Sequence, residues 1–147
     1  MFRLAHRITL SREEAEDVVQ DSLERLWRER ARLPLLKNVE AWSLRLVHNL
    51  SIDRLRRAGR QSLSLEPERD TPMAEGADHT LEMQERMAQV RAAMDRLPQV
   101  QRSIMHLRDI EGKSYAEIAE ILELTESQVK VYLHRGREKV KKSLVGV

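Results

Sequence analysis

Three basic side chains and a histidine near the C-terminus have the spacing of a single helical stripe. Lys130, His134, Arg137 and Lys141 follow one another at intervals of four, three and four residues, so an α-helix would place them on one face. Residues 125–144 contain six basic and two acidic side chains. Lysine and arginine neutralise phosphate and hydrogen-bond to base edges. Taken alone, the stripe is equally compatible with a DNA-binding helix and with a solvated face on a packing helix.

Two capping sequences in front of this stripe favour the DNA-binding interpretation. Residues 114–117 (SYAE) and 125–128 (TESQ) both have the form of a capping box, which predicts two helices separated by a short turn. Such a pair is a helix-turn-helix, in which the start of the second helix meets base edges and later basic residues meet phosphates. The positions predicted to pack the two helices are Ile118, Ala119, Leu122, Val129, Leu133, Val140 and Leu144.

The N-terminal half carries two further polar surfaces on predicted helices. Four side chains on the second helix, opposite its apolar residues Val19, Leu23, Leu26 and Trp27, form an outward face: Asp17, Gln20, Asp21 and Glu24. Such a face indicates either a protein partner or a solubilising surface. The third helix carries a set able to hydrogen-bond to bases and neutralise phosphates: Arg45, His48, Asn49, Asp53, Arg56 and Arg57. Trp27 and Trp42 could stack on bases, but their spacing favours the core.

Helical periodicity predicts an all-α protein of two small domains joined by a flexible linker. A first helix ends near Leu10, a second runs from the Ser11 capping box to about Arg32, and a third follows a loop over residues 33–40. Periodicity is absent from about Gly59 to Thr80, where proline, serine and acidic residues predict a connector. We therefore expect domains at residues 1–60 and 81–147, the second a helix-turn-helix, with a linker at 61–80.

Composition removes several classes of function. The chain has no cysteine, which excludes disulfides and thiolate metal sites, and its five histidines are isolated from one another. It has no glycine-rich phosphate loop, nucleophile elbow or long apolar run, so we expect no cofactor, no catalytic residue, no membrane insertion and a cytoplasmic location.

Several of these segments together resemble the extracytoplasmic-function group of bacterial RNA polymerase sigma factors, in the sigma-70 family. Residues 17–27 (DVVQDSLERLW) and 41–57 (AWSLRLVHNLSIDRLRR) are similar to successive helices of sigma region 2. Residues 97–102, 114–119 (SYAEIA) and 129–139 (VKVYLHRGREK) are similar to region 4. The resemblance implies a non-enzymatic factor that binds core RNA polymerase, through its β′ clamp helices and β flap, and directs promoter recognition and melting. It also implies an anti-sigma factor as a partner.

The resemblance also implies roles for individual residues. Asp17, Gln20, Asp21 and Glu24 would contact polymerase. An extruded base of the −10 element would be captured by Lys37 and Asn38 and read by the third helix, and such extrusion costs a few kcal/mol of unstacking. The full set expected at the −10 element is Lys37, Asn38, Arg45, His48, Asn49, Asp53 and Arg56. The set expected at the −35 element is Ser127, Gln128, Lys130, Val131, His134, Arg135, Arg137 and Lys141.

The chain departs from this family pattern at three places. It begins inside the family's first helix, Glu123 stands where many relatives have a turn glycine, and Tyr132 stands where a small or basic residue is usual. Two other functions are compatible with parts of the pattern. A free-standing helix-turn-helix regulator would bind operator DNA as a dimer, but the basic third helix gives the N-terminal half a nucleic-acid surface of its own. A metal-dependent nuclease would need paired carboxylates with a supporting lysine or histidine, and the sequence shows no such set.

Overall fold

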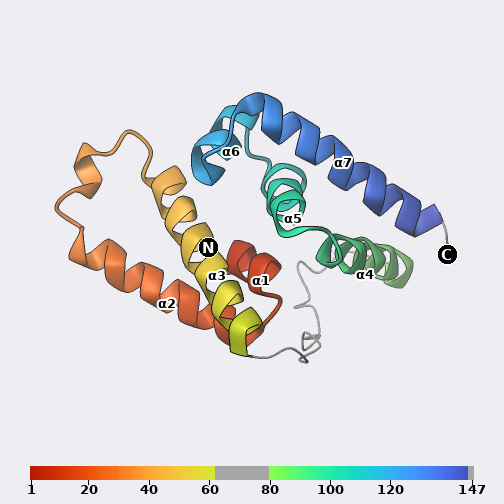
Figure 1. The fold of residues 1–147 in the computed structure, drawn as a ribbon, viewed down its shortest axis with the longest axis horizontal. Helices are drawn as coiled ribbons and strands as arrows, with labels where there is room; N and C mark the ends of the chain where they lie inside the picture. Colours follow the sequence, from red (N-terminus) through yellow and green to blue (C-terminus); the bar gives the residue numbers. More distant parts are fainter. Residues whose placement is uncertain (62–79, 146–147) are drawn as a thin grey trace.

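A computed structural model describes residues 1–61 and 80–145, and these residues form helices without any strand (Figure 1). The N-terminal half consists of α1 (Phe2–Thr9), α2 (Arg12–Arg28), a short 3-10 turn η1 (Leu33–Leu35) and α3 (Val39–Gln61). The C-terminal half consists of α4 (Leu81–Asp95), α5 (Gln99–Met105), the π-helical turn η2 (His106–Ile110), α6 (Tyr115–Leu122) and α7 (Glu126–Val145). The predicted all-α class is confirmed. Most of the predicted linker, at 62–79, lies outside the described residues.

Local capping fixes where the helices of the N-terminal half begin. Ser11 Oγ accepts a hydrogen bond from the Glu14 N–H at 3.3 Å, and Asn38 Oδ1 accepts from the Ala41 N–H at 3.0 Å. Both contacts satisfy N–H groups that have no partner within the helix. The second helix ends at Arg28 rather than at the predicted Arg32, because the chain turns through residues 29–32 into the 3-10 turn that contains Pro34.

The C-terminal half contains the predicted helix-turn-helix. Ser114 Oγ accepts from the Glu117 N–H at 3.1 Å to start α6, and Thr125 Oγ1 accepts from the Gln128 N–H at 3.1 Å to start α7. Between the two helices Glu123 adopts a left-handed conformation with φ 58° and ψ 45°. Glycine adopts this conformation without strain, so the glutamate makes the turn at a steric cost.

The two halves pack on each other and share one hydrophobic core. Its fully buried residues come from both halves and include Leu4, Ile8, Val47, Ile104 and Ile118. Helix α1 lies against α5, and α3 lies against α6. Additional ion pairs join the halves at Arg7 with Asp95 and at Lys113 with Glu40.

Each half also supplies an arginine that caps a helix of the other. Arg102 is 6% exposed and donates from Nη2 to the Ile8 carbonyl at 2.9 Å, at the C-terminal end of α1. Its Nη1 donates to the Asp95 carbonyl at 3.1 Å, at the end of α4. In the other direction, Arg45 donates from Nη2 to the Glu120 carbonyl at 2.6 Å, in the last turn of α6. A cation at a helix C-terminus also interacts favourably with the helix dipole.

Candidate functional site

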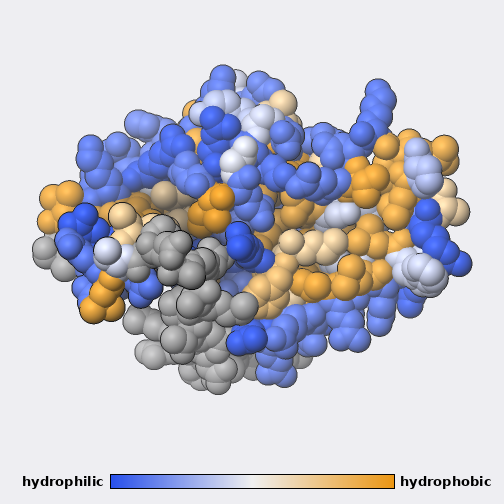
Figure 2. Space-filling view, turned by 180° about the vertical axis from the view of Figure 1, so that it is seen from behind, coloured by the Kyte–Doolittle hydropathy of each residue, from blue (hydrophilic) through white to orange (hydrophobic). Residues whose placement is uncertain are grey.

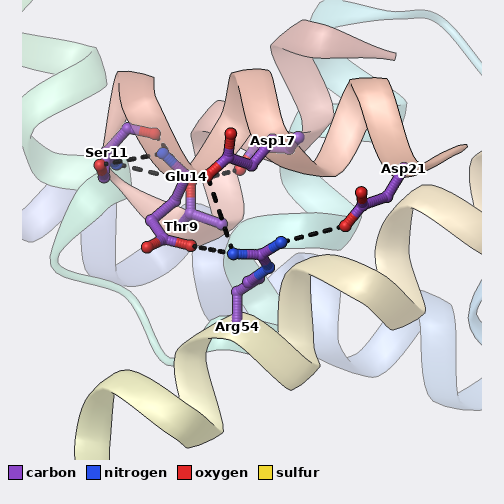
Figure 3. Close-up of polar contacts among 7 residues, drawn as sticks. Thr9, Ser11, Glu14, Asp17, Asp21 and Arg54 are labelled. Carbon is purple, nitrogen blue, oxygen red and sulfur yellow. Dashed lines mark hydrogen bonds and ion pairs between the residues drawn. The ribbon is translucent and has the colours of Figure 1, made fainter. Parts of the chain in front are cut away.

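The polar face predicted on α2 is present and points away from the core. Gln20, Asp21 and Glu24 are exposed and Asp17 is half-buried, whereas Ala15, Val18 and Ser22 fill the buried side of the helix. Asp17 and Asp21 face Arg54 of α3, together with Glu14 (Figure 3). We refer to Asp17, Gln20, Asp21 and Glu24 as the acidic face.

Two large apolar residues beside the acidic face are exposed, contrary to the prediction that they pack in the core. Leu23 is 54% exposed and Trp27 is 68% exposed, with the Arg30 guanidinium 4.3 Å from the Trp27 ring centroid. The prediction was wrong because the smaller residues Ala15, Val18 and Ser22 face α1 and α3 instead. Figure 2 shows a band of apolar side chains across the side of the molecule on which α2 and η1 lie. Trp42, by contrast, is half-buried.

The residues predicted at the −10 element divide into two groups in this structure. Lys37, Asn49, Asp53 and Arg56 are exposed on or just before α3. The others are engaged within the protein: Asn38 caps α3, Arg45 contacts α6, and His48 faces α5. The predicted third-helix surface is therefore only partly open.

His48 lies where the two halves meet. Its Nε2 is 3.4 Å from the Gln99 amide nitrogen, and its Nδ1 is 3.4 Å from Asn49 Oδ1. With the proton on Nδ1, the ring donates to Asn49 and accepts from Gln99, which is an arrangement for neutral imidazole. Burial lowers the pKa of His48, although Asn49 and Glu123 act in the opposite direction.

Most of the residues predicted at the −35 element are exposed on α7. Ser127, Lys130, Val131, His134, Arg135 and Lys141 are all exposed, while the packing side holds Val129, Leu133, Gly136 and Val140. Ile121 joins Ile118 in the core of α6, while Ala119 and Leu122 are only partly buried. Leu144 is 36% exposed, so it packs less completely than the sequence predicted.

Two members of the predicted −35 set have partners within the protein. The Gln128 side chain completes a reciprocal capping box, because its Oε1 accepts from the Thr125 N–H at 2.9 Å. Arg137 donates from Nε to Asp109 Oδ2 at 3.1 Å, and its Nη2 also contacts Asp109. This pair raises the pKa of Arg137 and ties α7 to η2. Lys130 lies 5.5 Å from the Tyr115 ring centroid.

Neither a metal centre nor a membrane span emerges from the described segments. Within residues 1–61 and 80–145, no three His, Cys, Asp or Glu side chains form a group that could hold a metal ion. In the same residues, no helix is both long enough and apolar enough to cross a bilayer.

Comparison with known proteins shows which family the chain belongs to. Residues 1–61 match the model of sigma-70 region 2, and residues 87–140 match the model of sigma-70 region 4. The chain is 32% identical to the ECF RNA polymerase sigma factor SigM of Mycobacterium tuberculosis, across 98% of this chain and 71% of that protein. It belongs to the ECF sigma factors. Because a region 2 and a region 4 occur together in this order, sigma factor function is favoured over that of a free-standing dimeric regulator.

Other ECF relatives extend this comparison. The sigma factor SigW of Bacillus subtilis is 29% identical over 98% of this chain and 82% of its own length. SigE of Mycolicibacterium smegmatis is 32% identical over 96% of this chain, which spans 56% of that relative. The fold is similar to that of RpoE from Bartonella quintana, solved with the anti-sigma factor NepR, with a TM-score of 0.81, 22% identity, and coverage of 97% and 88% of the two chains.

Proposed function

We propose that this sigma factor docks on core RNA polymerase through the acidic face of α2. The observation that supports this most directly is the outward exposure of Gln20, Asp21 and Glu24 along one side of α2. A basic helical surface on the polymerase, such as the β′ clamp helices, would complement this charge. The exposed Leu23 and Trp27 would extend the docking surface, because a buried aromatic residue is a frequent energetic anchor in protein interfaces.

We propose that promoter DNA contacts two surfaces of the protein, one on α7 and one on and just before α3. The exposed residues of α7, led by Lys130 and Arg135, would bind the −35 element as duplex in the major groove. Lys37, Asn49 and Arg56 would engage the −10 element as it melts. For Arg45 and His48 to join them, the halves must part, since both side chains face the C-terminal half here. The proposed activity is binding without a chemical step, carried out in the cytoplasm.

An anti-sigma factor is the expected regulator of these surfaces. The sigma factor RpoE, which this fold resembles, was solved with the anti-sigma factor NepR, and CnrH, which has a similar fold, was solved with the cytosolic domain of CnrY. We propose that a comparable protein covers the acidic face or the α7 surface of this chain.

Two assays test the docking and DNA-binding assignments. One measures co-elution with polymerase, and the other measures binding of the holoenzyme to promoter DNA. Asp21→Lys is expected to abolish co-elution with bacterial core RNA polymerase in size-exclusion chromatography at moderate salt. Lys130→Ala and Arg135→Ala should leave co-elution intact but weaken binding of the resulting holoenzyme to −35 promoter DNA, by about fivefold or more per contact.

Matched controls are available at exposed positions outside the proposed surfaces. Glu85→Lys reverses an exposed acid on α4, and Lys142→Ala removes an exposed lysine on α7 outside the proposed DNA set. Both should behave as the unmodified protein in both assays. If Asp21→Lys and Glu85→Lys co-elute equally well with polymerase, the acidic face is not the docking surface.

A further inference from the structure

A single arginine on α3 gathers three carboxylates of α2. Arg54 places Nη2 3.0 Å from Asp21 Oδ2, while its Nη1 lies 3.4 Å from Glu14 Oε2 and 3.8 Å from Asp17 Oδ2 (Figure 3). The three acids are spaced by three and four residues, so they form one row along the helix. Two members of this row, Asp17 and Asp21, belong to the acidic face proposed to dock on polymerase.

Arg54 contacts the row of carboxylates from the side of α3, and the opposite side of the row is accessible to a partner. Each carboxylate uses only one oxygen for Arg54, and Figure 3 shows the second oxygens of Asp17 and Asp21 turned away from the guanidinium. The side chains of Glu14, Asp17 and Asp21 are 41%, 49% and 47% exposed, compared with 29% for Arg54. Three carboxylates against one guanidinium leave two negative charges, so the row still attracts a basic partner.

The physical effect of such an arrangement is to order the acceptors before a partner arrives. Three neighbouring carboxylates without a cation would repel one another and sample separate rotamers. A planar guanidinium fixes them in one geometry, and side chains ordered in advance lose less entropy on binding. Removing Arg54 would make the row more negative, but salt screens that additional attraction at moderate ionic strength. The loss of order is therefore expected to outweigh the gain in charge.

We propose that Arg54 is a positioning residue of the polymerase-docking surface, holding Glu14, Asp17 and Asp21 as one row of acceptors for basic side chains of the partner. This inference rests on the proposed docking function and adds Glu14 to the surface. It also links two surfaces, because Arg54 lies on α3 directly after Asp53 and two residues before Arg56, both predicted at the −10 element.

The experiment measures the affinity of the full chain for purified core RNA polymerase. Fluorescence anisotropy with a labelled chain would compare Arg54→Ala, Asp21→Ala and the double variant. Arg54→Ala is expected to weaken binding about tenfold. In the Asp21→Ala background the same change should weaken binding less than about threefold, because Arg54 acts through the carboxylates it holds. Arg86→Ala is the matched control, since it also removes an arginine paired with an acid, Glu82, on the distant helix α4.

The conservative variant Arg54→Lys distinguishes positioning from a general effect on folding. Lysine keeps the charge but cannot span Glu14 and Asp21 together, so binding about threefold weaker than wild type, with an unchanged melting temperature, is expected. Arg54→Ala binding as tightly as wild type, or losing the full tenfold in both backgrounds, would overturn the positioning role. If Asp21→Ala itself has no effect on affinity, the docking surface is wrong, and the inference falls with it.

Discussion

Replacing Arg102 by alanine should strongly destabilise the protein, because this buried side chain closes the ends of two helices. The substitution removes the hydrogen bonds to the Ile8 carbonyl at 2.9 Å and the Asp95 carbonyl at 3.1 Å, and both carbonyls then lack this donor. Hydrogen bonds from charged donors contribute about 1.5–3 kcal/mol each. Burial lowers the pKa of Arg102, a cost opposed by Asp95 and increased by Arg7, so part of the gain is offset. A net loss of about 3 kcal/mol is expected.

Thermal unfolding followed by circular dichroism measures this loss directly. For a chain of this size, about 3 kcal/mol corresponds to a fall in Tm of roughly 6–12 °C. Arg96→Ala is the matched control, because Arg96 is exposed and close by in sequence and its loss changes the charge equally. Arg102→Lys, which can reach one carbonyl but not both, should melt between the two. A Tm for Arg102→Ala within about 2 °C of the control would refute the assignment of Arg102 as a stabilising cap.

Two other substitutions should change the stability of the protein or its dependence on pH. Glu123→Gly should raise stability by about 1 kcal/mol, because Glu123 holds φ at 58°, which glycine adopts without strain; denaturant unfolding should show the gain, and Glu123→Ala should not. His48 has a lowered pKa in the packed structure, so the unfolded chain binds its proton first as pH falls. The stability contributed by neutral His48 is complete above about pH 6.5 and declines below it. Unfolding measured between pH 7.5 and 5.5 should therefore show a smaller pH dependence for His48→Gln than for the wild type, and equal slopes would contradict this.

The parts of the fold predicted correctly from the sequence depend on local interactions. The caps at Ser11, Ser114 and Thr125 act across three residues, so their signal is contained in short segments. The orientation of α2 was predicted wrongly because Leu23 and Trp27 are more hydrophobic than Ala15 and Ser22, yet the small residues allow closer approach to α1 and α3.

Contacts between distant residues were not predictable in this way. Arg45 and Glu120 are 75 positions apart, and Arg102 and Ile8 are 94 apart, so no local pattern pairs them. Arg54 was missed as a functional candidate because only the crossing of α2 and α3 brings it to Asp21, 33 positions away. A basic residue on the polar side of α3 otherwise resembles its neighbours Arg56 and Arg57. The roles assigned to individual residues at the promoter and at polymerase remain predictions.

The reciprocal caps make the two halves poor candidates for free exchange between relatives. Arg45 of the N-terminal half ends α6, and Arg102 of the C-terminal half ends α1, so each half relies on the other for a helix terminus. A chimera that joins one half to a foreign partner retains these contacts only when the incoming half carries an arginine at the matching place. Arg45 is also predicted to read the −10 element. A substitution of Arg45 that is made to change promoter choice therefore also removes its contact with α6. Re-engineering specificity in this protein therefore calls for compensating changes on α6.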